Sequence, residues 1–359
     1  MNSTVENPIW DVAKLVMAFL VVGIHTHSGL RSADADFFLR EWLGRFAVPL
    51  FFLLAGYFLF QKTQPAERLV PPDSKTVGKY GLRILRMYVL WTCVYLIPQT
   101  FIWVRERAAF RQLLIYAEYA IVRGDSYMHL WYLSALCAAI FLIWALHRFC
   151  SLPAVGVTAF CLYVFGLLWL PHYYLVRGVV EGSAPLSGFY TLLNRYIGWP
   201  RNGMFYAFVF VVLGALLGRN ALKVMRGRKV WALTALFAAL SFAEVWWIRR
   251  QNGGSNATYC ALQLALIPAT YFLFCALSQI CIAPRPVYRT LRKCSTLIYC
   301  LHPMVMLLCD LLKKNDIARI FFSMPFTEWI VVYAAAFGLA LAWVRLERSP
   351  RLRFLRVMH

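Results

Sequence analysis

The segment from Trp10 to His25 reads WDVAKLVMAFLVVGIH, an apolar stretch that also carries Asp11 and Lys14. A helix rises about 1.5 Å per residue. The hydrocarbon core of a bilayer, about 30 Å thick, needs roughly 20 largely apolar residues to cross it. The stretch therefore predicts a helix within a membrane. Titratable side chains are costly there, so each of these is a candidate functional residue.

The polar residues of this segment fall on one side of the expected helix. Lys14 and His25 are eleven residues apart, which corresponds to about three turns plus 20° and roughly 16 Å along the axis. Asp11 lies one turn before Lys14 and can pair with it. Histidine titrates near neutral pH, which suits His25 to proton transfer. In the alternative interpretation, Lys14 reaches the headgroups and His25 is an interfacial histidine.

The rest of the chain repeats this apolar pattern. Of its 359 residues, 61% are hydrophobic and 15% charged, whereas soluble domains are nearer 45–50% and about 25%. We therefore expect an all-α, polytopic integral membrane protein in which residues 1–359 form one membrane-embedded domain, without a soluble domain and with the first span kept as an anchor. About ten spans are expected, at residues 8–28, 43–60, 81–103, 129–147, 153–171, 203–218, 230–248, 258–281, 296–312 and 326–345.

Charge predicts the orientation of these spans. The net charge is +21, and the larger share of Lys and Arg falls in the segments on the side of the N-terminus. Cytoplasmic segments are enriched in Lys and Arg, so both termini are expected to be cytoplasmic. The excess of basic residues then favours contact with anionic lipid, with room for a phosphorylated ligand, and not nucleic acid. No pair of Cys has zinc-ligand spacing with a His, so we expect no metal.

A cationic cluster is expected at the cytoplasmic end of the third span. Arg83 and Arg86 are three residues apart and share a helix face, and Lys75 and Lys79 precede them. The planar guanidinium donates two hydrogen bonds at once and suits phosphate. The alternative is that the cluster only anchors the helix on the cytoplasmic side.

Further polar residues occur near the expected outer surface. His129 and Trp131 open the fourth span, and Arg201 precedes the sixth. Tyr299 and His302 are further polar candidates, but they lie early in the ninth span, toward its cytoplasmic end. An aromatic belt at the interface explains Trp131 but explains His129 less well. Each of these residues is a weaker candidate than His25.

Six short motifs follow one another along the chain, and in this order they resemble the acyltransferase 3 family of bacterial membrane proteins. The motifs are Asp11, Lys14 and His25; Arg45, Pro49, Phe51, Phe52 and Gly56; Arg83 and Arg86; His129 to Leu133; Arg201 to Gly203; and Tyr299, His302 and Pro303. Two positions depart from the family pattern, because Ala55 replaces the usual serine and Lys14 the commoner arginine.

The resemblance implies a multi-pass protein of the bacterial cytoplasmic (inner) membrane. It implies transfer of an acyl group, usually acetyl, from cytoplasmic acyl-CoA as co-substrate to a hydroxyl of a cell-envelope glycan or lipid-linked sugar. In the family the first-span histidine, here His25, is thought to be catalytic, and its basic partner and the Arg-x-x-Arg motif are associated with CoA. We therefore expect the catalytic region at His25, Lys14 and Asp11.

The expected chemistry assigns roles to the other candidates. His25 would act as general base, or alternatively carry a transient acyl group. Because Lys14 and Asp11 lie too far along one helix to touch His25, they would line the channel for the pantetheine arm. The CoA phosphates would bind Arg83, Arg86 and Lys79. The acceptor would bind at residues His129, Trp131, Arg45, Arg201, Tyr299 and His302, with His129 and Trp131 facing the sugar.

A rival function is a transporter or flippase of a small polar solute such as serine. Intramembrane His, Lys and Asp also form proton relays. The membrane halves of certain vancomycin-resistance serine racemases resemble the same family and are thought to move serine. No racemase domain is expected here, which favours acyl transfer. A non-catalytic membrane scaffold is a third possibility.

Overall fold

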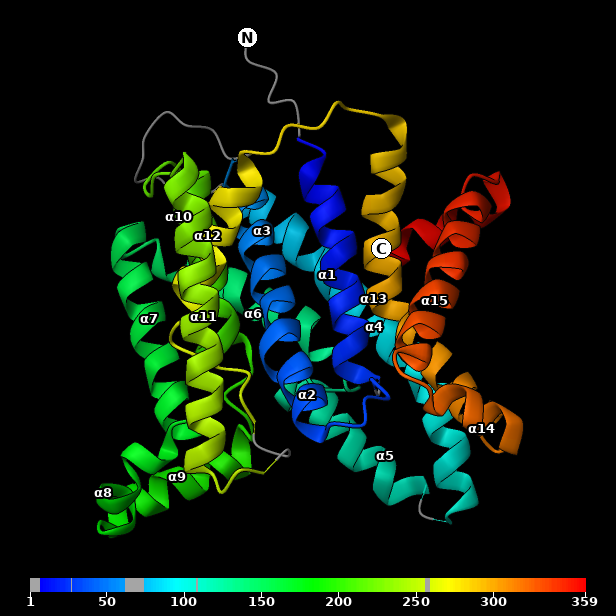
Figure 1. Cartoon of the computed structure of the whole chain (residues 1–359), viewed down its shortest axis with the longest axis horizontal. Coiled ribbons are helices and arrows are strands. Elements are labelled where there is room, and N and C mark those ends of the chain that lie inside the picture. The colour runs from blue at the N-terminus through cyan, green and yellow to red at the C-terminus, as the bar shows by residue number, and fades with distance from the viewer. Residues whose placement is uncertain (1–6, 27, 62–73, 108, 256–258) are drawn as a thin grey trace.

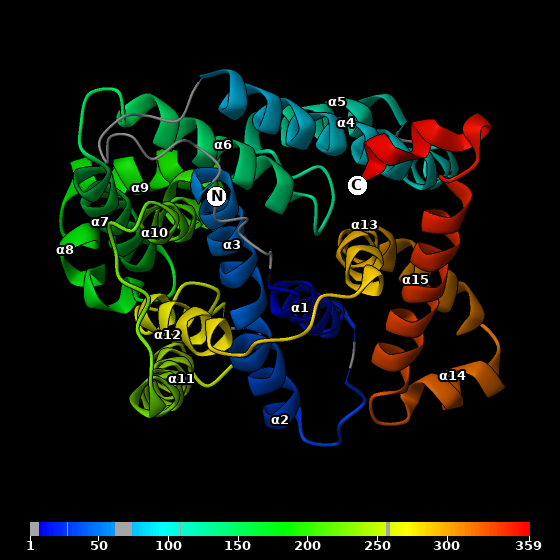
Figure 2. The ribbon, with the colours of Figure 1, turned by 90° about the horizontal axis from the view of Figure 1, so that it is seen from above.

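The computed structural model describes residues 7–26, 28–61, 74–107, 109–255 and 259–359. The regular structure of these residues is helical. Figure 1 shows a layer of upright helices whose successive members run in opposite directions, and Figure 2 shows the same helices from one end. The upright helices are α1 (Ile9–His25), α3 (Ala47–Gln61), α4 (Ser74–Arg105), α6 (Trp131–Leu146), α7 (Leu152–Trp169), α10 (Phe208–Gly218), α11 (Arg228–Gln251), α12 (Leu266–Ser278), α13 (Pro286–Leu312) and α15 (Thr327–Leu346).

The structure confirms the expected class, a helical protein with helices suited to a membrane. A helix lies in every one of the ten apolar blocks. Six helices of the described residues are long and apolar enough to cross a membrane: Ala33–Gln61, Lys75–Arg105, Leu152–Trp169, Arg228–Gln251, Pro286–Leu312 and Thr327–Leu346. Helix α1 begins and α15 ends on the same side of the layer (Figure 1). The count of ten spans and the cytoplasmic side of both ends stay predictions.

The eighth expected span, 258–281, is wrong in its first part. Helix α12 begins only at Leu266, and residues 259–265 are non-helical although most of them are buried. Irregular backbone is tolerated at membrane depth only where protein groups bond its polar atoms. Side chains from three other helices accept its N–H groups, namely Glu41, Tyr163 and Glu244. An apolar run alone could not reveal these bonds.

Shorter helices occupy the connectors. Helices α5 (Ala109–Glu118), α9 (Ala184–Tyr196) and α14 (Asp316–Ser323) lie across one end of the upright layer (Figure 1). Their exposed apolar side chains, such as Phe110 and Ile317, suit the boundary between headgroups and acyl chains. The remaining short elements are α2 (Ala33–Phe38), η1 (Leu39–Leu43), η2 (Gly44–Phe46), η3 (Tyr119–Arg123), η4 (Tyr173–Leu175), α8 (Arg177–Glu181), η5 (Gly203–Ala207) and η6 (Pro350–Met358).

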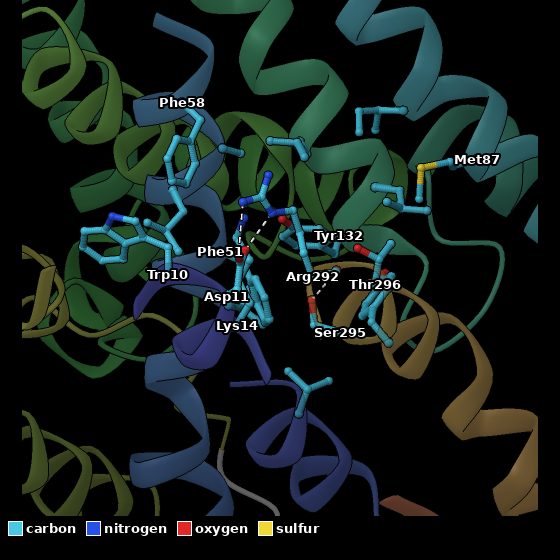
Figure 3. A pocket seen from close by; sticks show the side chains of 18 of the residues that line it. Trp10, Asp11, Lys14, Phe51, Phe58, Met87, Tyr132, Arg292, Ser295 and Thr296 are labelled. Atoms are coloured by element: carbon cyan, nitrogen blue, oxygen red, sulfur yellow. Dashed lines mark hydrogen bonds and ion pairs between the residues drawn. The ribbon is translucent and has the colours of Figure 1, made fainter. Parts of the chain in front are cut away.

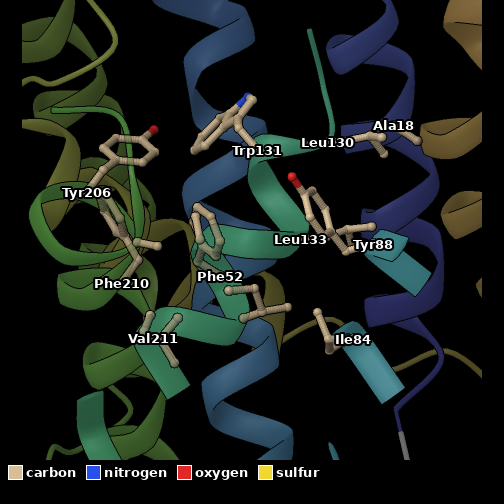
Figure 4. Close-up of a cluster of buried hydrophobic side chains, with 14 of the residues drawn as sticks. Ala18, Phe52, Ile84, Tyr88, Leu130, Trp131, Leu133, Tyr206, Phe210 and Val211 are labelled. Atoms are coloured by element: carbon tan, nitrogen blue, oxygen red, sulfur yellow. The ribbon is translucent and has the colours of Figure 1, made fainter. Parts of the chain in front are cut away.

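Two glycines allow α3 and α10 to pack closely. A Cβ at Gly56 would overlap the Val211 carbonyl oxygen, and a Cβ at Gly214 would overlap that of Leu53. Small residues permit such backbone approach between membrane helices, as expected for Gly56. Around this contact lies the main buried core (Figure 4), to which Phe52 contributes from α3. The core holds fixed the helices that carry the polar residues.

Candidate active site between two cavities

Helices α1 and α13 lie side by side and run in the same direction (Figures 1 and 2). Near their beginnings, Arg292 makes a bidentate ion pair with Asp11, with Nε–Oδ1 and Nη2–Oδ2 distances of 2.7 and 3.0 Å. Further along, the rings of His25 and His302 are 5.3 Å apart between centroids. Each of the two helices therefore carries a charged residue near its beginning and a histidine further along.

A cavity of about 280 Å³ follows these two helices and is called here the inner cavity. Figure 3 shows Arg292 and Asp11 bonded to each other at its wall, with Lys14 beside them. Lys14 Nζ lies 4.9 Å from the centre of the Phe58 ring. The charged residues that line it are Asp11, Lys14, Arg83 and Arg292, and its other polar lining residues are Asn7, Tyr80, Tyr132, Ser295, Thr296 and Tyr299.

The cationic cluster expected on α4 is divided by the fold. All three side chains are exposed, but only Arg83 lines the inner cavity, whereas Arg86 and Lys79 are not among its lining residues. Three residues turn a helix by about 300°, so side chains that share a broad face still differ in direction by about 60°. The neighbouring apolar side chains Leu82 and Leu85 are exposed. This side of α4 therefore faces away from the protein.

Three histidines form a row beside Tyr299, and none of the three is among the residues that line the inner cavity. The ring of His302 is 5.3 Å from that of His25 and 5.3 Å from that of His129, between centroids. His129 and His302 are buried, and His25 is half-buried. Tyr299, which lines the inner cavity, donates its hydroxyl to the His129 carbonyl oxygen over 2.5 Å. The row thus joins α1, the start of α6 and α13.

A second cavity of about 600 Å³, called here the outer cavity, lies on the other side of α6. The His129-Leu-Trp-Tyr-Leu motif separates the two, since Trp131 lines the outer cavity and Tyr132 the inner one. The outer cavity has charged lining residues, among them Asp125 and Arg201, and an apolar part along α6 that includes Phe141. Burial raises the pKa of the Asp125 carboxyl above its ordinary value, although the positive charges of Arg201 and Arg123 act to lower it.

Each residue of the Arg-Asn-Gly motif has a role at the outer cavity. The Arg201 guanidinium lies 4.6 Å from the centre of the Trp131 ring. The Asn202 Oδ1 accepts from the backbone N–H groups of two following residues and caps η5. A Cβ at Gly203 would clash with Ala138 of α6. The motif thus fixes the start of η5 against α6 and points its arginine at the tryptophan.

Arg45 is held inside the protein by a carboxylate of its own segment. Its guanidinium makes two hydrogen bonds to Glu41, at 3.2 and 2.5 Å. Glu41 in turn accepts the backbone N–H of Cys260, so the pair fastens the non-helical segment 259–265. The Arg45 guanidinium also lies 5.6 Å from the Tyr259 ring centre. Contact of Arg45 with a substrate stays a prediction.

Arg292 is the residue that the sequence analysis missed. It stands ten positions before His302, and this cation–histidine spacing on α13 echoes the eleven positions between Lys14 and His25 on α1. That repeat was a usable signal. The described part of the chain contains no group of three His, Cys, Asp or Glu placed to hold a metal ion.

Comparison with known proteins places the chain in a family. Residues 7–345 match the acyltransferase 3 family, which is described as an acyltransferase domain. The chain therefore belongs to the acyltransferase 3 family, and its apolar helices are those of a multi-pass membrane protein.

Two curated relatives carry other names. An amino-acid racemase of Enterococcus faecalis is 30% identical over 209 residues, 58% of this chain and 27% of that protein. A serine/alanine racemase of Enterococcus gallinarum is 26% identical over 299 residues, 82% of this chain and 40% of that protein. The chain thus spans less than half the length of these relatives. No solved structure matches it.

Proposed function

We propose that the protein is a membrane O-acyltransferase that moves an acyl group, with acetyl as the expected case, from cytoplasmic acyl-CoA to a hydroxyl of a cell-envelope glycan or glycan precursor. One observation carries the proposal. The inner cavity is lined by cations and also by Tyr299, which bonds to His129 of the histidine row. Membership of an acyltransferase family supports it.

The donor is assigned to the inner cavity. Lys14, Arg83 and Arg292 line it and would bind the CoA phosphates, for which Arg provides paired donors. Asp11 keeps Arg292 in place through its bidentate bond. The rise from Lys14 to His25 is about 16 Å, a length that the extended pantetheine arm can follow. The thioester would then lie near the histidine row.

The acceptor is assigned to the outer cavity. Trp131 and Trp199 offer aromatic faces on which a sugar ring can stack, and the Asp125 carboxyl offers a hydrogen-bonding group. The cavity continues along the apolar side of α6 past Phe141, which is exposed. A polar end joined to an apolar end favours a lipid-linked sugar as the acceptor.

The chemistry assigned to His25 is general-base catalysis. One imidazole nitrogen takes the proton of the acceptor hydroxyl while the hydroxyl oxygen forms a bond to the thioester carbonyl carbon. The carbon–sulfur bond then breaks, and the CoA thiolate leaves and takes up the proton from His25. The products are the O-acyl ester and free CoA, with no proton gained or lost. We assign stabilisation of the oxyanion that forms to the positive charge of Arg201, whose guanidinium lies over Trp131, and to that of Arg45.

The test uses membranes that contain wild type or His25→Ala, supplied with radiolabelled acetyl-CoA and native cell-envelope glycans. We expect label in a glycan with wild type only. Loss of a positioned base lowers the rate by about 10²–10⁴-fold, whereas CoA binding and protein level stay near normal because His25 lies about 16 Å along α1 from Lys14. Full transfer by His25→Ala would contradict the assignment of the base.

A second candidate function is transport of a small polar solute such as serine. The observation in its favour is that the curated relatives are amino-acid racemases, one of them named for serine and alanine. Proton-coupled serine uptake by proteoliposomes that contain the purified protein, without glycan acylation in the membrane assay, would favour transport. Glycan acylation without uptake would favour the enzyme.

A further inference from the structure

Pro303 leaves one backbone carbonyl of α13 without its usual partner. In an α-helix the N–H of residue i bonds to the carbonyl of residue i−4, and proline has no N–H. The carbonyl affected is that of Tyr299. Although it contains this proline, α13 is one continuous helix from Pro286 to Leu312.

The side chain of His302 takes the vacant place. Its Nδ1 lies 2.9 Å from the Tyr299 carbonyl oxygen and 3.1 Å from that of Ile298. A carbonyl oxygen only accepts, so Nδ1 must carry the proton. In a neutral ring the lone pair is then on Nε2, which is buried and has no hydrogen-bond partner among the described residues. The proline thereby fixes the tautomer of the histidine.

The ring so oriented lies within reach of His25. Two imidazoles joined by an N–H···N bond of ordinary length have centroids about 5 Å apart. The observed separation of the His25 and His302 centroids is 5.3 Å, with an angle of 34° between the rings. Catalytic hydrogen bonds are often loose without substrate and tighten in the complex. A small rotation would let His302 Nε2 accept from His25.

We propose that Pro303 and His302 form a positioning unit for His25, a proposal that rests on the acyl-transfer function above. The Nε2 lone pair of His302 accepts the N–H of His25 and thereby turns the other His25 nitrogen toward the acceptor hydroxyl. When His25 takes the hydroxyl proton, the resulting imidazolium keeps this bond to a neutral partner. His302 gains and loses no proton in the step and touches no reacting atom.

The first arm of the test does not depend on activity. Solid-state ¹⁵N NMR of histidine-labelled protein in lipid bilayers reports which ring nitrogen is protonated, and His302→Asn, His25→Ala and His129→Gln assign the signals. We expect the Nδ1–H tautomer for His302 in the wild type. In Pro303→Ala the new backbone N–H competes for Tyr299, so this tautomer should lose population and the His25 signals should move. An Nε2–H tautomer in the wild type, or movement of the His129 signals alone, overturns the proposal.

The second arm measures acetyl transfer. Groups that orient metal-binding histidines contribute about 10–100-fold. By analogy, Pro303→Ala should lower kcat by about that range, with KM for acetyl-CoA within about twofold. Pro98→Ala, which removes the proline inside α4, is the matched control and should leave kcat unchanged. In the His302→Asn background, Pro303→Ala should have no further effect, because no Nε2 remains to be oriented.

The two arms separate failure of this proposal from failure of the proposed function. A full kcat in Pro303→Ala, or equal losses in Pro98→Ala and Pro303→Ala, overturns the positioning unit while acyl transfer stands. Absence of transfer in the wild type rejects the proposed function, and the NMR arm still decides whether the proline fixes the tautomer.

Discussion

At the scale of single residues, Arg83 and Arg86 provide a matched pair, because only Arg83 lines the inner cavity. A hydrogen bond to a charged group contributes about 1.5–3 kcal/mol. We therefore expect Arg83→Ala to raise KM for acetyl-CoA by about 10–100-fold, whereas Arg86→Ala should change it by less than about twofold. Initial-rate kinetics with purified protein would show this. Equal effects of the two substitutions would contradict the assignment of the phosphates to the inner cavity.

Asp11 is a buried carboxylate whose charge is matched by Arg292. The Arg292 side chain is 40% exposed and that of Asp11 only 3%. Loss of Arg292 should therefore cost less than the roughly 3–5 kcal/mol typical of a fully buried pair. We expect Arg292→Ala to lower both thermal stability and acetyl-CoA affinity. The double variant Arg292→Ala/Asp11→Asn should regain thermal stability but not the affinity for acetyl-CoA. Thermal stability is measured by heating followed by size-exclusion chromatography, and affinity by binding of acetyl-CoA. If the double variant regained both thermal stability and acetyl-CoA affinity, Arg292 would have only a structural role.

At the scale of elements, the contact between α3 and α10 depends on glycine. Gly214 meets the Leu53 carbonyl oxygen, whereas a Cβ at Gly338, on α15, would meet nothing within 4 Å. Gly214→Ala should therefore lower stability by about 1–3 kcal/mol through overpacking. Gly338→Ala should leave stability unchanged or raise it by up to about 1 kcal/mol, because alanine lowers the conformational entropy of the unfolded chain. Melting temperatures in one detergent test both, and similar values would contradict the close contact.

The C-terminal 3-10 helix, η6, is connected to the rest of the protein by bonds to Glu347. Glu347 accepts from Lys293 and from His359, the latter over 2.5 Å. Burial works to raise the pKa of the Glu347 carboxyl, but the bonds from Lys293 and His359 bring it below its ordinary value. Its contribution to stability is therefore present above the ordinary pKa and is lost as the pH falls through the lower, folded value.

Neutralising that carboxylate should release η6. We expect Glu347→Gln to increase tryptic cleavage after Arg351 and Arg353 at neutral pH. Glu181→Gln removes an exposed pair with Arg177 and serves as the control, since exposed pairs contribute little. Unchanged cleavage in Glu347→Gln would show that other contacts hold the segment, such as the bond from Trp91 to the Met358 carbonyl oxygen.

At the scale of the whole molecule, the distribution of Lys and Arg predicts that the inner cavity opens to the cytoplasm. Ser255 is exposed after the end of α11, whereas Cys150 is exposed between α6 and α7 and Cys281 between α12 and α13. The end of α11 lies on the opposite side of the helix layer from the beginnings of α7 and α13 (Figure 1). On intact cells, a membrane-impermeant maleimide should label Ser255→Cys and leave the native Cys150 and Cys281 unlabelled until the cells are opened. Labelling of Cys150 and Cys281 in intact cells would reverse the orientation and place the cations outside.

The sequence by itself determined the helical membrane class, the approximate place of every main helix and most of the polar candidates. These features depend on local properties, namely runs of apolar residues long enough for a bilayer and the 3.6-residue period. The period placed Lys14 and His25 on one side of α1. It could not decide whether Arg83 or Arg86 faces the cavity, because both lie within one broad face.

Only the tertiary structure decided which distant residues meet. The row of His25, His302 and His129 and the pair of Asp11 with Arg292 join segments far apart in the chain. Their meeting depends on the rotation and relative height of packed helices, which close contacts such as that at Gly214 set. The buried non-helical segment before Leu266 is stable for the same reason, because side chains of other helices bond its backbone.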